Sequence, residues 1–563
     1  MTKSRILFIT SAITFSMTSQ SVIAATPDAG SLQQEILRNR EAPPTAGPAI
    51  NTPPKLSESP IRGKSFFLKE FVFEGNTLLS NERLMRALSP CLNQELDFER
   101  LKSCAALVTE TYQAAGWIAK AVLPQQDIRE GRVTIKIIEA KFGSYVFSGQ
   151  DASRVSKEQL KRVLDAYQKP GDMLNMKNVD RALLLADDIP GVGVTGNLDQ
   201  GAQDGLTNVI IQLADEPLIS GNTSVDNHGS ISSGSNRFNA SLNANSPLRL
   251  GDLLTLNSMI SAGNRYARAE QTFPLGSRGV RFGVNASYLN YKLTEAQYSG
   301  MDIIGSAKTI GLSTSFPIVR SRQQNLNIIF NVDKKFYLNL AGANSVSDYE
   351  IKTNSIGVDG NLFDDFWGGG ANYGAVTWTR GFKDLSGSIN QQSDALTANT
   401  QGNFSKIRYS FSRQQKINEA WSTFVNLSGQ HTQRNLDSSE SFFLGGSTGV
   451  RAYPTNEGRG SQGQLLMLEL RARLPQGFSW VGFYDWGRVV GYPLNNFNGA
   501  SEPNTFTLKG YGMSVTWQTS KGTTLKSTLA RRVGINPNPT SSGADQDGTL
   551  IKNRLWLSAS LPF

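Results

Sequence analysis

Apolar and polar residues alternate along the chain from about residue 217 to Phe563. In the segment 406–412, Ile407, Tyr409 and Phe411 are apolar and the residues between them are polar or charged. Successive side chains of a β-strand point to opposite faces, so this pattern predicts strands with one apolar and one polar face. About sixteen such segments fit in this part of the chain, at about twenty-two residues each including the connection.

The segment 466–474 shows the same pattern with charges on its polar face. Leu466, Leu468, Leu470, Ala472 and Leu474 share one face. The other face carries Glu469, Arg471 and Arg473. We interpret these three charges as a general polar lining and not as specific contacts.

Alternation alone also fits a soluble β-sandwich, but two features favour a membrane β-barrel of about sixteen antiparallel strands over residues 217–563. The number of segments suits a barrel with an even number of strands. The sequence also ends in an alternating segment, 555–563, whose last residue is Phe563. The last strand of bacterial outer-membrane barrels commonly ends in Phe, so Phe563 is our candidate insertion signal.

The region before the barrel repeats one pattern. A strand opens each copy, at 71–77 and at 145–150, and two helices and two strands follow. Two βααββ units, 66–142 and 143–216, are therefore predicted. The expected helices are 82–88, 98–115, 157–167 and 176–188, and the expected later strands are 117–123, 132–142, 192–198 and 206–213.

The N-terminus has the features of a secretory signal peptide. Lys3 and Arg5 precede an apolar stretch from 6 to 17, and small residues at 24 and 25 offer a cleavage site. We therefore exclude residues 1–25 from the fold, with a single anchor helix as the alternative interpretation.

A short helix and a linker follow the signal peptide. Leu32, Ile36 and Leu37 have near-helical spacing, which predicts a helix within 26–40. Residues 41–65 contain several prolines and little that is apolar, and this predicts an extended linker. A helix at the end of such a long linker either makes no fixed contacts or fills an opening elsewhere in the protein.

Composition excludes several classes of protein. Charged residues make up 18% of the chain and hydrophobic residues 39%, which is a low hydrophobic share for a helical membrane protein. Past the N-terminus, no apolar run approaches the length of a membrane-spanning helix, so this class is excluded. The net charge of +9 would suit nucleic acid, but the basic residues are scattered, so no nucleic-acid partner is predicted.

The two cysteines, Cys91 and Cys104, lie in the exported part of the chain. In an oxidising compartment they predict one local disulfide, which contributes about 3 kcal/mol by the loop-entropy estimate. No metal site is predicted, because two thiols and the distant His228 and His431 do not make a coordination shell.

One glycine-rich stretch, 442–454, does not resemble an exposed loop. Phe442, Phe443, Val450 and Tyr453 favour an enclosed site, and the only charge among them is Arg451. We predict a loop that is folded into a hollow interior, where Arg451 forms an ion pair with a carboxylate. The alternative is a solvated loop arginine. The candidate motif is Gly449, Val450, Arg451, Ala452, Tyr453 and Pro454.

A partner for Arg451 lies on a strand further along the chain. Asp485 stands among aromatic neighbours, where an isolated carboxylate would be costly, so an enclosed pair with Arg451 is predicted. The alternative is any neighbouring base, such as Arg488. The candidate motif on this strand is Phe483, Asp485 and Gly487.

Two motif matches do not carry function. Residues 191–196 satisfy G-x-G-x-x-G but enter a predicted strand, whereas the dinucleotide fingerprint leads into a helix. Residues 445–449 satisfy G-x-S-x-G around Ser447, but a strand follows and only two histidines are available, so esterase activity is not favoured.

These motifs resemble known families. The openings FVFEGNT at 71–77 and YVFSGQ at 145–150 are similar to polypeptide-transport-associated (POTRA) domains, which precede outer-membrane barrels in the periplasm. The loop VRAY at 450–453, followed one strand later by FYDWG at 483–487, resembles the two-partner secretion transporters. This TpsB family of haemolysin activator/secretion proteins belongs to the barrel-assembly superfamily. The resemblance covers essentially the whole mature chain.

The resemblance implies how the parts are used. Residues 435–460 would be an extracellular loop folded back into the pore, with Arg451 paired to Asp485 on the inner wall and the N-terminal helix blocking the channel. Ala452 stands where many relatives have Gly, which the backbone is expected to tolerate.

The implied function is that of an outer-membrane transporter in a Gram-negative bacterium. It would recognise a large TpsA-type exoprotein through its POTRA domains and translocate it unfolded to the cell surface. We expect a monomer without enzyme activity, cofactor or metal, in contact with outer-membrane lipid and, during biogenesis, with the barrel-assembly machinery. A haemolysin, an adhesin, a haem-binding protein and a contact-dependent toxin are equally compatible clients.

Three other functions are less favoured. An assembly factor for other barrels usually has more POTRA domains and lacks the tethered helix. A passive porin needs neither the small domains nor a plug. An outer-membrane esterase would depend on Ser447.

Overall fold

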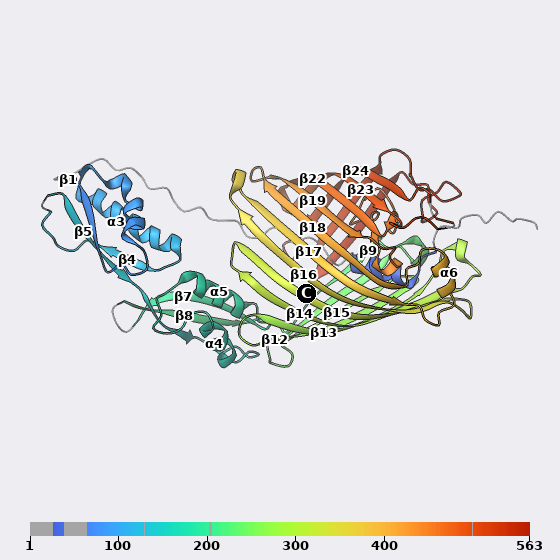
Figure 1. Ribbon diagram of the computed structural model, residues 1–563, viewed down its shortest axis with the longest axis horizontal. Coiled ribbons are helices and arrows are strands. Elements are labelled where there is room, and N and C mark those ends of the chain that lie inside the picture. Colours follow the sequence, from blue (N-terminus) through green and yellow to red (C-terminus); the bar gives the residue numbers. More distant parts are fainter. Residues whose placement is uncertain (1–25, 39–64, 129, 202–204, 498, 501) are drawn as a thin grey trace, which may run out of the picture.

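The structure is a computed structural model, and it describes residues 26–38, 65–128, 130–201, 205–497, 499–500 and 502–563. The predicted signal peptide, and the predicted linker up to residue 64, lie outside the described residues. Two small domains lie in a row at one end of a large barrel (Figure 1). We refer to that end as the domain end and to the other as the far end.

Sixteen antiparallel strands close into the barrel, as predicted. The first eight are β9 (Ile219–Asp226), β10 (Arg237–Asn245), β11 (Leu253–Ile260), β12 (Asn264–Leu275), β13 (Val280–Lys292), β14 (Ile303–Arg320), β15 (Gln324–Ala341) and β16 (Asn344–Asp364). The others are β17 (Gly370–Asp384), β18 (Gly402–Lys416), β19 (Trp421–Thr432), β22 (Gln462–Arg473), β23 (Phe478–Val490), β24 (Thr505–Gln518), β25 (Thr524–Arg532) and β26 (Asn553–Pro562).

The last strand closes the barrel against the first. β26 pairs antiparallel with β9, from Ser558 opposite Asp226 to Pro562 opposite Asn222. The backbone N–H of Phe563 donates to the carbonyl of Gly221 at 3.0 Å, and the N–H of Gly221 donates back at 2.9 Å. The ring of strands therefore has no open edge, as a sheet in lipid requires. The role of Phe563 in insertion stays a prediction.

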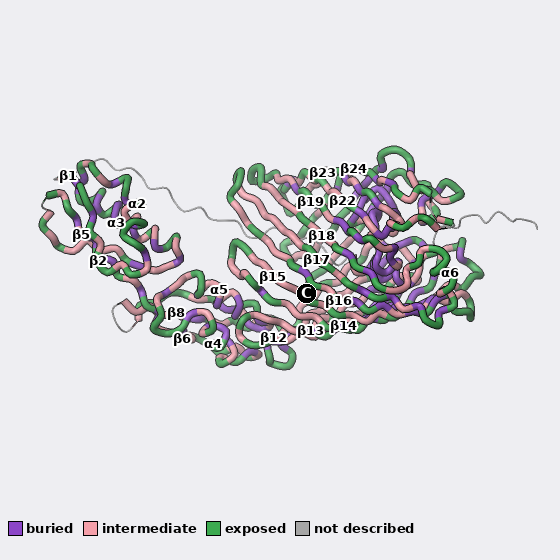
Figure 2. The backbone as a smooth tube through the Cα atoms, in the orientation of Figure 1, coloured by how far each residue is buried: buried purple, intermediate pink, exposed green. Residues whose placement is uncertain are grey.

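The alternation places apolar side chains outside and polar ones inside. On β22, Leu468 and Leu470 are exposed on the outer face, whereas Glu469 between them points inward and is 7% exposed. Buried residues gather toward the far end of the barrel (Figure 2), where the inward side chains of two apolar clusters lie. The lumen is therefore filled at that end.

The first small domain is a three-stranded sheet covered by helices. β2 (Glu70–Glu74) pairs parallel with β5 (Arg132–Glu139), and β4 (Ala119–Val122) pairs antiparallel with β5. The helices are α2 (Asn81–Ala87) and α3 (Phe98–Ala115), and a separate two-stranded sheet joins β1 (Phe66–Leu68) to β3 (Gln94–Leu96).

The helix α3 begins where the sequence predicts, because Asp97 caps it by accepting the N–H of Arg100 at 2.8 Å. Cys91, just before β3, and Cys104 on α3 form a disulfide, as predicted. The bridge joins the helix to the segment before it across a sequence separation of 13 residues.

The second small domain repeats the first. β6 (Lys141–Ser148) pairs parallel with β8 (Leu206–Asp215), and β7 (Val192–Gln200) pairs antiparallel with β8. The helices α4 (Lys157–Asp165) and α5 (Met176–Asp187) cover the sheet. The predicted βααββ repeat is thus confirmed. The glycine-rich match at 191–196 leads into the strand β7, so its interpretation as a turn into a strand is also confirmed.

The second domain is bonded to the domain end of the barrel. Asp188, just after α5, accepts two hydrogen bonds from the guanidinium of Arg320 on β14, at 2.7 and 2.8 Å. Arg181 on α5 donates to the carbonyls of Pro317 and Ile318 at 2.7 and 2.8 Å. The helix α5 therefore fixes this domain against one side of the barrel mouth.

Within the described ranges, every helix is too short or too polar to cross a membrane.

Candidate functional site

The glycine-rich loop lies inside the barrel. It connects β19 to β22 over residues 433–461 and enters from the far end, where β19 stops. Leu444, Val450, Ala452 and Tyr453 are at most 1% exposed. They pack against inward side chains of β22 to β25, namely Leu465, Phe483, Val489, Phe506, Leu508 and Ala530. The apolar loop residues thus find the enclosed site that the sequence predicts.

Arg451 binds Asp485, the predicted partner. Its Nε donates to Oδ2 at 2.9 Å and its Nη2 to Oδ1 at 2.6 Å. Its backbone N–H also donates to Oδ2 at 3.0 Å. Asp485 is completely buried, so this two-pronged pair is a strong, charge-assisted contact between the loop and β23.

Two further contacts hold Arg451. Its guanidinium lies 3.5 Å from the centroid of the Phe483 ring, a close cation–π contact. Its backbone carbonyl accepts a hydrogen bond from Nε1 of Trp556 on β26 at 2.7 Å. Arg451 therefore joins the loop to both β23 and β26. Arg488, the alternative partner of Asp485, lies on the exposed outer face instead.

Glu469 also binds Arg451, and here our interpretation of a general lining was wrong. Nη1 of Arg451 donates to Oε1 of Glu469 at 2.7 Å. Arg471 forms an ion pair with the other oxygen of Glu469, also at 2.7 Å. The strand pattern predicts which residues face the lumen, but it contains no information about which of them meets a loop from another part of the chain.

The glycines of both motifs leave room for close contacts. A Cβ on Gly449 would lie 1.9 Å from the carbonyl oxygen of Leu444. A Cβ on Gly487 would lie 2.6 Å from a methyl group of Leu444. Ala452 fits because Gly510 faces it: a Cβ on Gly510 would lie only 2.5 Å from the Cβ of Ala452. The expectation that the backbone tolerates Ala452 is therefore confirmed.

Two carboxylates before the motif attach the loop to the opposite side of the lumen. Asp437 forms an ion pair with Lys383 of β17 at 2.6 Å. Glu440 forms ion pairs with Lys335 of β15 at 2.7 Å and with Lys406 of β18 at 2.6 Å. The sequence analysis missed both residues, because they lie in a polar stretch that resembles an ordinary turn.

A short helix, α1 (Ala29–Arg38), also lies within the lumen near the far end (Figure 1). Its residues from Ala29 to Ile36 are all buried. The backbone N–H of Ala29 donates to Oδ1 of Asn339 at 2.9 Å. Nε2 of Gln33 donates to the hydroxyl of Thr309 at 3.0 Å. These partners lie on β15 and β14, so the helix rests on that wall.

The helix and the loop are bonded to each other. The hydroxyl of Ser438 contacts both carboxylate oxygens of Asp28 at 2.8 Å. Nδ2 of Asn456 donates to Oε2 of Glu35 at 2.9 Å. Nη1 of Arg38 donates to the carbonyl of Phe443 at 3.1 Å. The two elements therefore form one obstruction that touches both walls.

Two kinds of chemistry that the sequence did not favour are esterase catalysis at Ser447 and metal binding. Ser447 has no histidine as a hydrogen-bond partner, and His228 packs its ring against Trp556 at 5.7 Å. In the described part of the chain, no three or more His, Cys, Asp or Glu side chains are grouped so as to hold a metal ion.

A sixteen-stranded barrel with two small α+β domains and an inward loop defines the class of outer-membrane β-barrel transporters with POTRA domains. The family described as "Haemolysin secretion/activation protein ShlB/FhaC/HecB" matches residues 205–515, and the family "POTRA domain, ShlB-type" matches residues 66–140. The chain belongs to the haemolysin secretion/activation family. It is thus an outer-membrane transporter of two-partner secretion, with POTRA domains in the periplasm.

Curated relatives match over most of their length. The "Heme/hemopexin transporter protein HuxB" of Haemophilus influenzae (strain ATCC 51907 / DSM 11121 / KW20 / Rd) is 26% identical over 559 residues, which cover 96% of each chain. The "Outer membrane transporter CdiB" of Dickeya dadantii (strain 3937) is 23% identical over 428 residues, which cover 74% of each chain.

Solved structures show the same fold. CdiB from Escherichia coli superposes with a TM-score of 0.67 at 18% identity, covering 94% of this chain and 95% of that one. BamA from Haemophilus ducreyi lacking POTRA domains 1–3 superposes with a TM-score of 0.53 at 14% identity, covering 88% of this chain and 99% of that one.

Proposed function

We propose that this transporter receives one large exoprotein at its second POTRA domain and passes it unfolded through the barrel, while α1 and the inward loop keep the pore closed at rest. The observation that carries the proposal is the pair of buried elements in the lumen. Arg451 fixes the loop to the wall, and the loop in turn holds α1. An open pore requires that these bonds break or shift.

The second POTRA domain offers an edge to which an extended client can add a strand. The sheet order is β6-β8-β7, so β7 lies at its edge. The N–H of Val194 on that edge is occupied by Asp187 at 2.7 Å, but further along β7 Leu198 is 44% exposed. The space beside Gly196 on β7 is filled by Leu183 of α5. Backbone hydrogen bonds to β7 would supply affinity, and Leu198 would add an apolar contact.

Client binding would open the pore by a shift of population. A client that binds more tightly when the lumen is empty favours states in which α1 has left and the loop has moved. The client would then fold outside the cell, and this folding would supply the energy. The family members are transporters, and we propose that this chain likewise has no enzyme activity, functions as a monomer in outer-membrane lipid and is inserted by the barrel-assembly machinery.

For the exported client, we propose only the class of protein to which it belongs. The relatives named above are a heme/hemopexin transporter protein and the outer membrane transporter CdiB. A TpsA-type exoprotein is therefore the class that we propose for this chain.

Replacing Arg451 with Ala tests the function of the loop. The change leaves Asp485 buried without its cation, so the loop is expected to leave its position and secretion to fall at least about ten-fold, consistent with a cost of about 3–5 kcal/mol for breaking a buried pair. The measurement is the amount of exoprotein in the medium. The probe is the exoprotein whose secretion is lost when this chain is deleted.

The matched control is Arg471→Ala. Arg471 also binds Glu469, but its side chain is 30% exposed, and its other partners are Gln414 on β18 and Phe424 on β19. This variant is expected to secrete nearly normally. Both variants are expected to reach the outer membrane and to keep the heat-modifiable mobility of a folded barrel. Normal secretion by the folded Arg451→Ala variant would contradict the proposed role of the loop.

A further inference from the structure

We propose that a row of four cations on the outer face of the barrel binds a phosphate-bearing glycolipid of the outer leaflet, of the lipid A type. The row consists of Lys308 on β14, Lys334 on β15, Lys352 on β16 and Arg380 on β17. It borders an apolar hollow in the same face. The inference concerns the lipid side of the barrel, so it is independent of the client and of its route through the lumen.

The four side chains of the row point away from the lumen. The side chains of Lys334 and Lys352 are 44% and 56% exposed, and Lys308 and Arg380 are exposed as well. Thr309, the neighbour of Lys308 on β14, is bonded to α1 inside the lumen. Because successive side chains of a strand face opposite sides, Lys308 faces the lipid.

The stagger of the four residues keeps them at one level along the barrel axis. Lys334 and Lys352 are direct partners in the register of β15 and β16. Lys308 lies two positions farther toward the far end than the partner of Lys334 on β14. Arg380 lies two positions nearer the domain end than the partner of Lys352 on β17. The domain ends of the strands shift in the same direction, since β16 continues past Leu362, the partner of the first residue of β15. Tilted strands require such a stagger in any row at constant height.

The outward residues of β16 show where this level lies in the membrane. Ile356 and Leu362 are apolar and exposed, and the turn after β16 carries the exposed, stacked rings of Phe366 and Trp367, which suit a membrane–water interface. A strand rises about 3.4 Å per residue, so the segment from Leu362 to Lys352 climbs roughly 26 Å along the axis at a usual tilt of about 40°. The lipid-facing band of such barrels is about 25 Å tall. The row therefore lies at the headgroups of the outer leaflet.

A hollow of about 400 Å³ lies in the outer face beside Lys334 and Lys352. Its apolar lining includes Ile310 and Leu312 on β14 and Val332 on β15, which are 59%, 45% and 52% exposed. An acyl chain that fills the hollow removes these side chains from other contacts, while the two ammonium groups reach the headgroup. The site thus suits a molecule that is apolar at one end and anionic at the other.

The row carries an excess of positive charge. Glu350 is shared by two lysines, at 2.8 Å from Lys334 and 2.9 Å from Lys352. In the described part of the chain, Lys308 and Arg380 have no carboxylate at ion-pair distance. Two further outward carboxylates lie beyond the row toward the far end, Asp348 and Asp384. Within the row itself, four cations face one carboxylate, so an anionic ligand is favoured.

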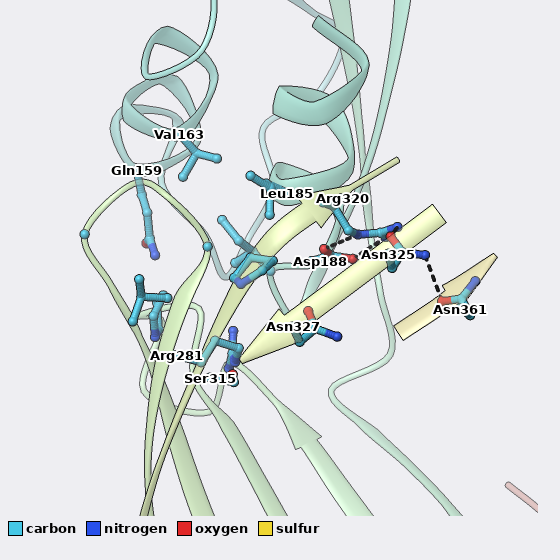
Figure 3. A pocket seen from close by; sticks show the side chains of 16 residues that line it. Gln159, Val163, Leu185, Asp188, Arg281, Ser315, Arg320, Asn325, Asn327 and Asn361 are labelled. Atoms are coloured by element: carbon cyan, nitrogen blue, oxygen red, sulfur yellow. Dashed lines mark hydrogen bonds and ion pairs between the residues drawn. The ribbon is translucent and has the colours of Figure 1, made fainter. Parts of the chain in front are cut away.

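The cations at the domain end are paired in a different way. Figure 3 shows Arg320 at the end of β14 bonded to Asp188 of the second POTRA domain, beside a cavity of about 450 Å³. Arg322, in the turn after β14, forms an ion pair with Asp180 of α5 at 2.8 Å. Each of these two arginines therefore has a carboxylate of its own from the POTRA domain, whereas the far-end row faces lipid.

The width of the row favours a headgroup with two phosphates. Neighbouring strands lie about 4.8 Å apart, so the row from β14 to β17 is roughly 14 Å wide. A single phosphate contacts only part of it. A lipid A-type headgroup carries a phosphate at each end of an acylated sugar disaccharide. Lysine binds phosphate as a point charge and arginine binds it with two parallel hydrogen bonds, so both ends of the row can hold one.

Binding of lipid A by the purified full-length chain tests the site. Lys334→Gln with Lys352→Gln removes the cations at the rim of the hollow and is expected to weaken binding about ten-fold or more, because hydrogen bonds to charged groups are the stronger ones. Lys334→Arg with Lys352→Arg keeps both charges and is expected to bind within about two-fold of the unchanged chain. The measurement is the lipid-bound fraction of the transporter as lipid A is titrated, followed by native mass spectrometry.

The matched control is Lys509→Gln with Arg531→Gln. These exposed cations also lie near the far end, on the neighbouring strands β24 and β25, and their removal changes the net charge by the same amount. This variant is expected to bind lipid A normally. An equal loss in the control would indicate diffuse attraction to a charged rim and would overturn the site. Normal binding by the Lys334→Gln, Lys352→Gln variant, folded as judged by its heat-modifiable mobility, would overturn it too. If that variant does not fold, Lys308→Gln with Arg380→Gln takes its place with the same expected loss.

Two further probes identify the ligand. Phosphatidylglycerol, which has one phosphate, is expected to bind about ten-fold more weakly than lipid A, because it reaches only part of the row. Inorganic phosphate is not expected to compete with lipid A, because it leaves the hollow empty. Equal binding of phosphatidylglycerol would assign the row to phospholipid and overturn lipid A as the occupant. Competition by inorganic phosphate would show an anion site without a lipid and would also overturn the proposal.

Discussion

Asp485 and Glu469 both bind Arg451, but they do not bind it equally. Asp485 is completely buried and accepts three hydrogen bonds from Arg451, one of them from its backbone. Glu469 accepts one, and Arg471 neutralises it as well. The position of the loop therefore depends mainly on Asp485.

This difference predicts an order of effects. Asp485→Asn removes the charge that faces a buried guanidinium, so secretion is expected to fall about ten-fold or more, whereas Glu469→Gln is expected to cost about three-fold or less. The measurement is secreted exoprotein per folded transporter. An equal loss in the two variants would show that the charges act as a set and not through the Asp485 pair.

Glu139 in the first POTRA domain is a second residue whose charge matters. It accepts hydrogen bonds from the backbone N–H groups of Thr77 and Leu78, at 2.8 and 2.9 Å, and from the hydroxyl of Tyr112 at 2.7 Å. Burial alone would raise the pKa of this carboxyl, but the hydrogen bonds from Thr77, Leu78 and Tyr112 hold its pKa below the usual 4.5.

A lowered pKa in the folded domain makes stability depend on pH. The carboxylate contributes its full stabilisation above about pH 4.5, the usual pKa of a glutamate, and loses it as the pH falls through the lower folded pKa. The unfolding temperature of the first domain is therefore expected to drop below about pH 4.5. In Glu139→Gln this dependence is expected to be smaller, and calorimetry of both proteins between about pH 3 and 7 checks it. An unchanged pH profile in the variant would exclude Glu139 as the cause.

At the scale of elements, α1 shows how surroundings determine a helix. Ten residues are too few for a stable isolated helix in water. Gln33, Gln34 and Glu35 form a side that would normally face solvent, yet here all three are buried in the lumen. The polar wall and the loop supply the partners that water would otherwise provide, so α1 is stable only where it is docked.

Removing this element is expected to open the pore. Deletion of residues 27–40 takes away the backbone and side chains that fill the lumen beside Asn339, so the single-channel conductance in planar bilayers is expected to rise several-fold. Substituting Glu35→Ala alone removes one contact to the loop and is expected to give brief openings at the same high level. A deletion variant that inserts normally but conducts no more than the full chain would contradict the role of α1 as a plug.

At the scale of the whole molecule, the second POTRA domain is aligned with the mouth of the barrel by a few bonds from α5. The Asp188–Arg320 pair and the donors of Arg181 all reach β14. The second POTRA domain and the lumen are therefore held in one orientation. If this domain receives the client, as proposed, a bound segment would reach one side of the mouth.

A charge exchange tests whether that alignment matters. Arg320→Asp or Asp188→Arg alone places like charges together and is expected to reduce secretion about three-fold or more, whereas the double variant is expected to recover. The Lys292→Asp change, on the same sheet but bonded to Asp302 and away from the POTRA domain, is the control. Single variants that secrete normally would show that the junction is only a tether.

The sequence favours the Arg451–Asp485 pair over a solvated Arg451 or an Asp485–Arg488 pair, because each residue stands among apolar neighbours where an unpaired charge is costly, and the structure shows the pair. The barrel and the POTRA repeat follow from periodicity for a similar reason, since each pattern extends over many residues. Glu440, in contrast, stands in a polar stretch, where a charge can be solvated and needs no ion-pair partner. Nothing in the sequence therefore indicates its two lysine partners.

The hydrogen bonds that join side chains of β15 to side chains of β16 could not be predicted for a related reason. Alternation on β15 places Asn325 and Asn331 on the inward face, but the register that brings them opposite Asn361 and Ser355 depends on the turn between two strands. Which side of the mouth the POTRA domain covers depends on Arg181 and Asp188, whose partners lie more than a hundred residues away.

The bonds between α1 and the loop have one more consequence. Ser438 and Asn456 belong to the loop, and they bind Asp28 and Glu35 of the helical segment. Because coupling between two sites is reciprocal, whatever free energy the loop adds to retention of the helix, the helix adds to retention of the loop. An antibody that binds the loop from outside the cell and holds it in position would thus also retain the helix, without contacting the helix. It would act from the extracellular side, whereas the client approaches from the periplasm.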